Sequence, residues 1–385
     1  MLPLKQLCVL ALVITTASCS SRNEEKVYSF DIGEKKDVIL LSQISDRIDF
    51  IYFKDSQQSY FSQLDKVQLF NGLIYCTERT SASLLIFDME GDLIKQIKTV
   101  GKGPDEYTAI SDYCIDEIGE RVVIYDLSSK SFFVYSLFGD FQERIKTSWF
   151  FDEVESLDGY FFGYAPSDHS IVNDTTYPPG LTVLDKGFRF VRTAYCPMSS
   201  IPHKKKPSLF KTNGLLLFNP FWSYQVFQVS SEGINPFFKL NFKGHMFNDK
   251  KPMDYFNVGL DYRINDGVVG DFLNISINSK FVYFNALMAN SSFFCFVKKQ
   301  SGEKLIGNAI FNDLVGAPGL NFVGSSGDCL YFTDSRNDIP TKENWRKLYQ
   351  GIHKTDPDKT LIDKYEQIAP LAGRPSERLL IQVKI

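Results

Sequence analysis

Residues able to support metal-assisted chemistry are few in this chain and widely separated. Only four histidines occur, and none has another at the short spacing of a zinc site. Three of them, His169, His203 and His245, fall in long predicted loops and could in principle converge. Carboxylates at predicted strand ends offer the oxygen ligands that Ca²⁺ prefers, although such residues also cap loops; they are Glu78, Asp126 and Asp334. We therefore predict no catalytic residue and no cofactor, with Ca²⁺ left open.

Aromatic residues are candidates for binding a ligand by stacking. Tryptophan is costly to expose unless it packs or stacks, and all three tryptophans, Trp149, Trp222 and Trp345, lie near predicted loops. They could form a platform that stacks sugar rings, or each could pack against its own loop. The run Gly101–Tyr107, G-K-G-P-D-E-Y, lacks the Lys-Ser/Thr pair and the following helix of a phosphate-binding loop. We interpret it as a connection between structural units and keep Glu106 and Tyr107 as alternative ligand contacts.

The elements that must position these residues are short β-strands. Apolar runs of four to five residues, Leu73–Cys76, Leu84–Phe87 and Leu93–Ile97, are separated by hairpin-turn residues such as Glu90-Gly91. The first hairpin turn of this unit recurs at intervals of 40 to 65 residues, at Asn71-Gly72, Ile118-Gly119, Asp158-Gly159, Asn213-Gly214, Asn278-Ser279 and Ser326-Gly327. Four strands per unit, repeated six times, predict an all-β fold, a six-bladed β-propeller with four antiparallel strands per blade.

The last unit and the closure of the ring are the least regular part of this pattern. Lys347–Ile352 and Thr360–Tyr365 are predicted as the third and fourth strands of unit 6, and no useful helical period is found in the chain. Arg47–Phe53 precedes the first unit, where a fourth strand of the preceding blade belongs. We expect it to pair with C-terminal strands, including Arg378–Ile385, so that no sheet edge stays open.

Long insertions are predicted on one face of the ring. In a four-stranded blade, the 1–2 and 3–4 turns lie on one face, and the 2–3 loops and blade connections lie on the other. All insertions belong to the second class, namely 165–180, 195–207, 243–270 and 334–346. Elaborated loops on one face of a repeat protein usually form its binding face.

The N-terminus carries an export signal. Lys5 and the apolar run Leu7–Thr16, too short to span a bilayer, lead to Thr16-Ala17-Ser18-Cys19, a pattern similar to a lipoprotein cleavage site. We predict a signal peptide at 1–18, lipidation of Cys19 within a polar tether at 19–35, and a single propeller domain at 36–385. The alternative is an ordinary cleaved secretory signal. Five further cysteines, at wide spacings, are expected to be unpaired.

The charge composition of the chain limits the kinds of partner that it can bind. The net charge is −4 and no basic face is visible, which argues against a nucleic-acid partner. The chain resembles the six-bladed β-propeller lipoproteins, NHL-repeat-like proteins of gut-type Gram-negative bacteria. Three segments carry this resemblance: Ile48–Phe53, Leu84–Asp88 with Gly91, and Gly101–Tyr107. It implies a fold and an outer-membrane location, on the periplasmic side or at the cell surface, but no reaction.

Together these patterns favour a lipid-anchored, non-catalytic binding or scaffold protein that takes a glycan, peptide or protein ligand on its long-loop face. A metal-dependent propeller hydrolase or lyase acting at the channel mouth is the alternative function. Convergence of acids with His169, His203 or His245 at the pore would favour the enzyme. Exposed, stacked tryptophans would favour a glycan-binding protein.

Overall fold

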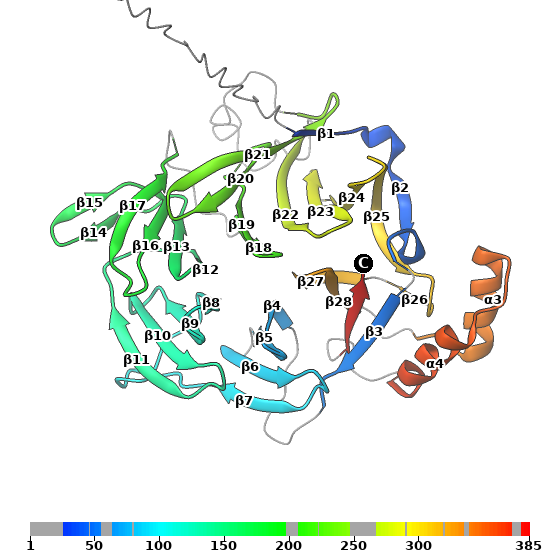
Figure 1. Ribbon diagram of the computed structural model, residues 1–385, viewed down its shortest axis with the longest axis horizontal. Helices are drawn as coiled ribbons and strands as arrows, with labels where there is room; N and C mark the ends of the chain where they lie inside the picture. The colour runs from blue at the N-terminus through cyan, green and yellow to red at the C-terminus, as the bar shows by residue number, and fades with distance from the viewer. Residues whose placement is uncertain are drawn as a thin grey trace, which may run out of the picture.

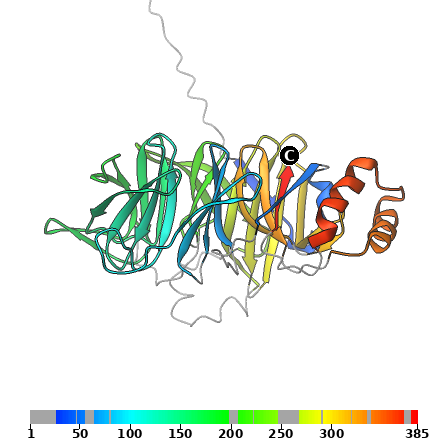
Figure 2. The ribbon, with the colours of Figure 1, turned by 90° about the horizontal axis from the view of Figure 1, so that it is seen from below.

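Six antiparallel sheets surround a central axis in the computed structural model (Figure 1). The structure describes residues 26–45, 47–54, 64–78, 81–197, 207–221, 223–246, 267–288, 291–318, 320–334, 339–371 and 379–385. Seen from the side, the ring is a flattened disc (Figure 2). The predicted six-bladed β-propeller is confirmed.

The first three blades follow the four-strand pattern directly. Blade 1 contains β4 (Leu64–Phe70), β5 (Leu73–Glu78), β6 (Ser83–Asp88) and β7 (Leu93–Ile97). Blade 2 contains β8 (Asp112–Asp116), β9 (Arg121–Asp126), β10 (Ser131–Ser136) and β11 (Phe141–Lys146). Blade 3 contains β12 (Glu153–Leu157), β13 (Tyr160–Ala165), β16 (Gly180–Leu184) and β17 (Phe190–Tyr195), with a hairpin of β14 (Ser170–Val172) and β15 (Thr175–Tyr177) inserted.

Blades 4 and 5 are extended by additional strands, whereas blade 6 has four strands drawn from both ends of the chain. Blade 4 contains β18 (Leu209–Thr212), β19 (Leu215–Phe218), β20 (Gln225–Ser230) and β21 (Gly233–Phe242). Blade 5 contains β22 (Val269–Ile277), β23 (Phe281–Met288), β24 (Ser291–Lys298) and β25 (Lys304–Asn312), with β26 (Ala317–Pro318) beside β25. Blade 6 contains β27 (Leu320–Ser326), β28 (Cys329–Asp334), β29 (Leu379–Lys384) and β3 (Arg47–Tyr52).

The hairpin turns have the backbone geometry that their residues favour. Asn71 and Gly72 have φ of 51° and 74°, and Asp158-Gly159 and Asn213-Gly214 repeat this pair of left-handed conformations. Two consecutive positive φ angles match the right-handed twist of a tight hairpin, and Asn, Asp and Gly adopt them at the lowest cost. This local chemistry is why the blade pattern could be predicted from the sequence.

The N-terminal segment runs along the outer edges of three successive blades. β1 (Lys26–Phe30) adds a parallel strand to blade 4, and β2 (Lys36–Leu40) adds one to blade 5. Short 3-10 turns, η1 (Ile32–Glu34) and η2 (Leu41–Gln43), link these strands to β3. The predicted tether at 19–35 is therefore too long at its C-terminal end, because the propeller already includes Lys26. Hydrogen bonding of these backbones to β21 and β25 explains the difference.

Ring closure combines both ends of the chain. β3 pairs antiparallel with β29, with Ile51 opposite Leu380 and Ile48 opposite Val383. The predicted pairing of Arg47–Phe53 with C-terminal strands is confirmed. The closure covers the edge that blade 6 would otherwise expose.

The predicted third and fourth strands of unit 6 are wrong, because both segments are helical. α3 (Lys342–His353) and α4 (Lys359–Ile368), followed by η3 (Ala369–Leu371), form an insertion between β28 and β29. Thr341 and Asp358 cap the two helices by accepting hydrogen bonds from the amides of Asn344 and Leu361. Buried residues at helical spacing, Leu361, Tyr365 and Ile368, lie on one face of α4.

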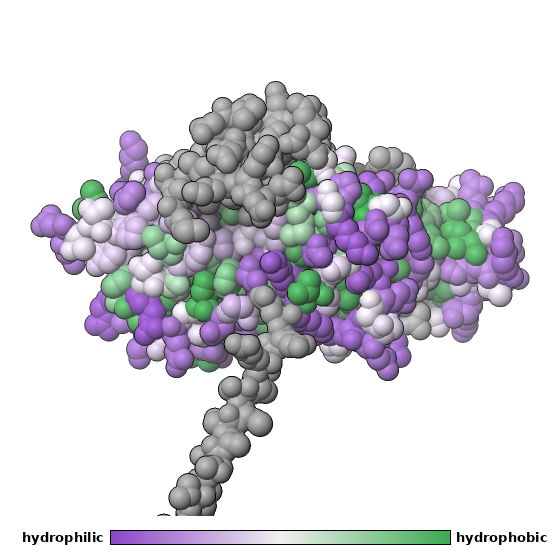
Figure 3. Space-filling view, turned by 90° about the horizontal axis from the view of Figure 1, so that it is seen from above, coloured by the Kyte–Doolittle hydropathy of each residue, from purple (hydrophilic) through white to green (hydrophobic). Residues whose placement is uncertain are grey.

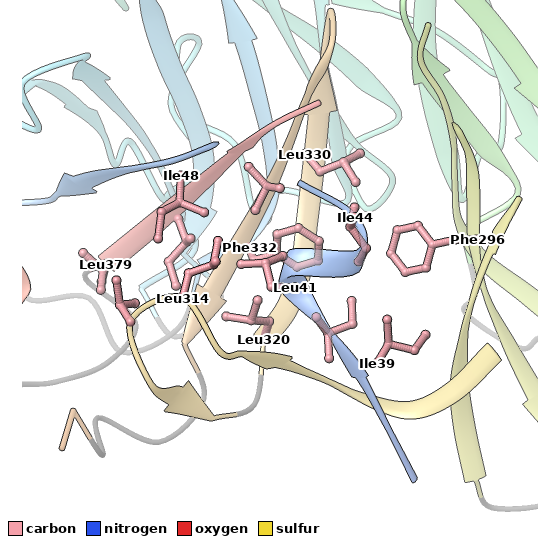
Figure 4. Packing of buried hydrophobic residues seen from close by; sticks show 14 of the residues in the cluster. Ile39, Leu41, Ile44, Ile48, Phe296, Leu314, Leu320, Leu330, Phe332 and Leu379 are labelled. Carbon is pink, nitrogen blue, oxygen red and sulfur yellow. The ribbon is translucent and has the colours of Figure 1, made fainter. Parts of the chain in front are cut away.

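Apolar residues of the N-terminal segment and of blades 5 and 6 form one continuous core cluster (Figure 4). Ile39 and Leu41 from the N-terminal segment pack with Phe296 of β24 and with Phe332 of β28. Trp345 of α3 and Tyr365 of α4 belong to the same cluster, which fixes the helices at the rim (Figure 2). Along the described part of the rim in Figure 3, apolar residues occur in small groups between hydrophilic ones. Within the described ranges, no helix has the length and apolar character needed to cross a membrane.

Candidate functional site

A chamber lies at the centre of the ring, where the innermost strands of the blades meet. Its volume is about 1070 Å³, and all six blades contribute lining residues. The lining includes Ala109 and Ser111 from the connection between blades 1 and 2, and Pro166 and Phe221 from 2–3 loops. The chamber therefore opens on the face of the blade connections. A smaller hollow of about 300 Å³ on the opposite face is bordered by the first hairpin turns, including Asn71 and Asn213-Gly214.

The two sides of the chamber differ in charge. Its six carboxylates all come from blades 1 to 3: Asp65, Glu78, Asp112, Asp152, Glu153 and Glu155. Blades 4 to 6 contribute one lysine, Lys211, and otherwise uncharged side chains such as Asn274, Asn321 and Phe322. The only other cation among the described lining residues is Lys66 of blade 1. Negative charge is thus in excess and concentrated on one wall.

Lys66 joins the first three blades at the chamber floor. It lies in a β-bulge of β4 with a left-handed backbone (φ 26°). Its Nζ lies 3.0 Å from Asp112 Oδ1 and 2.8 Å from Glu155 Oε1, and it donates to the Tyr113 carbonyl oxygen at 2.6 Å. Burial by itself would lower the pKa of Lys66, but the carboxylates of Asp112 and Glu155 outweigh it and raise the pKa above its usual value. This lysine is therefore fully charged and neutralised by its neighbours.

Glu153 is held by backbone groups of the next blade. Its Oε2 accepts hydrogen bonds from the amides of Ser208 at 2.7 Å and Leu209 at 2.9 Å. Burial raises the pKa of Glu153 to about 8, against the opposing effect of these amide hydrogen bonds. Repulsion by Asp112 acts in the same direction as burial. This side chain therefore titrates close to neutral pH, which is typical of functional sites.

Tyr164, on the neighbouring strand β13, brings a buried hydroxyl to the chamber wall. The residue is 1% exposed, and its hydroxyl makes no hydrogen bond. The Phe221 amide lies near this oxygen without reaching hydrogen-bond geometry. Burial raises the pKa of Tyr164, as does the nearby Glu153 carboxylate. An unsatisfied buried hydroxyl costs free energy, so such a group in a cavity wall suggests a missing partner.

Three residues, Gln68, Lys211 and Ser325, border both hollows, and the first two extend polar side chains between them. Lys211 Nζ lies 2.8 Å from Glu117 Oε1 and 3.2 Å from the Ile115 carbonyl oxygen. Gln68 donates to Glu155 Oε1 at 2.6 Å. Both side chains line the chamber and the smaller hollow, so they form the floor between them.

The structure does not bring the two described tryptophans, Trp149 and Trp345, together. Trp149 is 3% exposed and packs against Phe151, Tyr177 and Phe190 at the outer side of blade 3. Trp345 is fully buried and stacked on Tyr365 at 4.4 Å, and its Nε1 donates to the Leu314 carbonyl oxygen at 3.0 Å. Trp222 lies outside the described residues. Neither described ring lines the chamber.

Glu106 and Tyr107 act within the G-x-G-P-x-E-Y connection. Glu106 Oε2 accepts a hydrogen bond from the Gly103 amide at 2.7 Å, and a Cβ on Gly101 would lie 1.9 Å from the same oxygen. Any side chain at position 101 would clash with this carboxylate, which explains why the residue is glycine.

Tyr107 is fully buried, and its hydroxyl lies 2.9 Å from the carbonyl oxygens of both Ala82 and Ile97. In this structure the motif stabilises the connection between blades 1 and 2.

The candidate metal ligands are dispersed. Asp126 accepts hydrogen bonds from the Thr108 and Ser128 amides and so caps loops. Glu78 accepts one from the Ser81 amide and also lines the chamber. His169 is exposed, and His245 Nδ1 lies 2.7 Å from the Gly267 carbonyl oxygen. His203, the Asp334 side chain and Cys19 lie outside the described part. Among described residues, no three His, Cys, Asp or Glu side chains are placed to hold a metal ion.

Two of the predicted insertions extend outwards from the ring. The β14–β15 hairpin and the α3–α4 pair both lie at its rim (Figures 1 and 2). Tyr177 of the hairpin contacts Trp149 and Phe190, and Tyr365 of α4 is buried in the cluster that includes Ile39 and Leu41 of the N-terminal segment. Parts of the other insertions, 198–206 and 247–266, lie outside the described residues. The described cysteines are unpaired, and Cys76, Cys114 and Cys295 are buried.

Comparisons with known proteins support the fold. The family described as a domain of unknown function, DUF4934, matches residues 27–368. This chain belongs to that family. A predicted exported protein of Bacteroides fragilis has a similar structure, with a TM-score of 0.72 and 14% identity over 94% of this chain and 99% of that one. A DUF4221 family member of Bacteroides vulgatus has a TM-score of 0.48 and 10% identity over 88% and 96% of the two chains. The search of curated proteins finds no match.

Proposed function

We propose that this protein is an exported, lipid-anchored binding or scaffold protein whose central chamber holds a ligand. The observation that carries this proposal is the chamber itself, about 1070 Å³ and lined by all six blades. Ligand sites are typically concave, largely preformed and lined by apolar side chains with a few placed polar groups. A propeller axis meets this requirement because each blade contributes one innermost strand to it.

The pairing of the charged groups supports binding rather than catalysis. Lys66 is neutralised by Asp112 and Glu155, and Lys211 by Glu117, so the floor is a preorganised polar surface. Preorganisation lowers the ordering cost of association. Peptides, glycans and an exposed segment of another protein remain the candidate ligands.

The sequence pattern and the similar fold support a proposal for the location of the protein. The lipoprotein-like signal ends at Cys19, and the similar Bacteroides fragilis protein is a predicted exported protein. We propose lipidation at Cys19 and an outer-membrane location for this NHL-like propeller. Labelling of growing cells with a radioactive fatty acid tests this directly. We expect label in the wild-type chain and none in Cys19→Ala, whereas equal labelling of both would refute lipidation at this residue.

Blocking the chamber tests the binding proposal. Asn321 is exposed on β27 and lines the chamber, so Asn321→Trp should fill part of the chamber with little effect on the core. Ile171 is 62% exposed at the β14–β15 hairpin, and Ile171→Trp is the matched control. In a thermal-shift screen of peptides and glycans, ligands should stabilise the wild type and Ile171→Trp but not Asn321→Trp. Ligands that stabilise all three equally would place binding elsewhere and refute the proposal.

A further inference from the structure

We infer that the chamber ligand carries a fixed positive charge, a guanidinium or ammonium group, that binds against the wall formed by blades 1 to 3. This inference rests on the proposed binding function and adds the charge of the ligand. The described lining contains six carboxylates and two lysines, and both lysines already contact carboxylates. An anionic ligand would have to displace those contacts on a lining where carboxylates outnumber lysines. A concave, partly dehydrated wall of one sign concentrates counter-ions of the other.

The Tyr164 hydroxyl is an independent sign of a ligand at this wall. It is buried, has no hydrogen-bond partner, and lines the chamber beside Glu153. A phenolic oxygen can accept a hydrogen bond from a guanidinium or ammonium N–H, and the neighbouring carboxylate can neutralise its charge. The uncharged side of the chamber, with Phe210, Phe221 and Phe322, suits the apolar stem of such a group. The geometry therefore fits a basic peptide side chain better than a neutral sugar.

Glu153 makes this binding depend on pH. Its carboxyl faces Asp112 and Lys66 from blades 2 and 1, Tyr164 from its own blade, and the Ser208 and Leu209 amides from blade 4. Since burial raises the pKa of Glu153 to about 8, the unliganded side chain is mostly protonated at neutral pH. A bound cation favours the ionised carboxylate, so binding releases a proton. Affinity should rise by up to about tenfold per pH unit below pH 8 and level off above it.

Isothermal titration with capped dipeptides tests the inference on the full mature chain. The probe is acetyl-Arg-Arg-amide, whose charge is constant between pH 6 and about pH 9 because arginine stays protonated. The citrulline analogue has nearly the same shape without the charge, and the capped Glu-Glu dipeptide has the opposite charge. We expect the arginine probe to bind at least about tenfold more tightly than the citrulline probe at 0.15 M salt, where surface attraction is screened.

Three variants locate the interaction. Glu153→Gln should abolish the pH dependence, and Tyr164→Phe should weaken binding about three- to tenfold without lowering the melting temperature. Asp140→Asn removes an exposed carboxylate on the outer part of blade 2 and should change neither the affinity nor its pH dependence. If Glu153→Gln unfolds, the pH profile of the wild type and the Tyr164→Phe variant still decide the question.

The possible failures are distinguishable. Equal affinity for the arginine and citrulline probes, or tighter binding of the glutamate probe, overturns the charge inference. Binding of a neutral or acidic ligand that Asn321→Trp abolishes would overturn it while upholding the chamber as a binding site. Failure of every ligand to show binding that depends on Asn321 would overturn both proposals.

Discussion

Removal of the Lys66 ammonium group should destabilise the propeller strongly. Lys66→Met retains the length of the side chain but leaves Asp112 and Glu155 without their shared cation. Breaking a buried ion pair by removing one partner costs about 3–5 kcal/mol. The Lys66 side chain is 30% exposed to the chamber, whereas that of Glu155 is 3% exposed, so water offsets part of the loss. We expect about 3 kcal/mol, at the lower end of this range.

Differential scanning calorimetry measures this loss. With an unfolding entropy of about 2.1 cal/mol/K per residue, 3 kcal/mol corresponds to a decrease of about 4 °C in the melting temperature of a chain of this size. Lys95→Met is the matched control, because Lys95 and Asp140 form an exposed pair worth less than about 1 kcal/mol. Adding Glu155→Gln to Lys66→Met should restore part of the stability, since one unpaired charge is removed. A Lys66→Met protein as stable as Lys95→Met would refute the described role of Lys66.

Three further perturbations test other parts of the structure. Burial raises the pKa of Glu153 from 4.5 to about 8, so its contribution to the free energy of unfolding is full below pH 4.5 and is lost as the pH rises through 8. In urea unfolding measured against pH, Glu153→Gln should flatten this decline. An unchanged pH profile would contradict the raised pKa. In the same assay, Trp345→Ala should lower the free energy of unfolding by about 3–5 kcal/mol. Leu348 is more exposed on the same helix, so Leu348→Ala should lower it by about 1 kcal/mol or less. Equal decreases for the two variants would argue against the buried stack of Trp345 on Tyr365. Tyr107→Phe removes the one O–H donor that the Ala82 and Ile97 carbonyl oxygens share and should cost about 1–3 kcal/mol, whereas a neutral effect would contradict the structural role of the motif.

The ring could be predicted from the sequence because its signals are local. Asn-Gly and Asp-Gly turns fix hairpins within two residues, and the apolar runs between them have the length of strands. Closure by Arg47–Phe53 followed from the need to cover a sheet edge, and β3 does so. The helices α3 and α4 were missed because their apolar residues, read in windows of six, resemble strands. Their caps, Thr341 and Asp358, are the signals that distinguish them.

The candidate site depends on contacts between blades, which no local pattern reveals. Lys66, Asp112 and Glu153 are far apart in sequence and meet only because each lies at the first strand of its own blade. A usable signal was present in Glu153-Val154-Glu155, where carboxylates alternate along an innermost strand and so point to the channel. The tryptophans were less informative. Their position next to loops did not distinguish an exposed ring from one that packs beneath an insertion, as Trp149 and Trp345 do.

The most direct test of a ligand-binding chamber is a crystal structure of the mature chain grown with acetyl-Arg-Arg-amide. We expect electron density for the dipeptide inside the chamber, with one guanidinium within hydrogen-bond distance of Glu153 and the Tyr164 hydroxyl. Clear density for the dipeptide on the outer rim, with the chamber holding only solvent, would contradict this account.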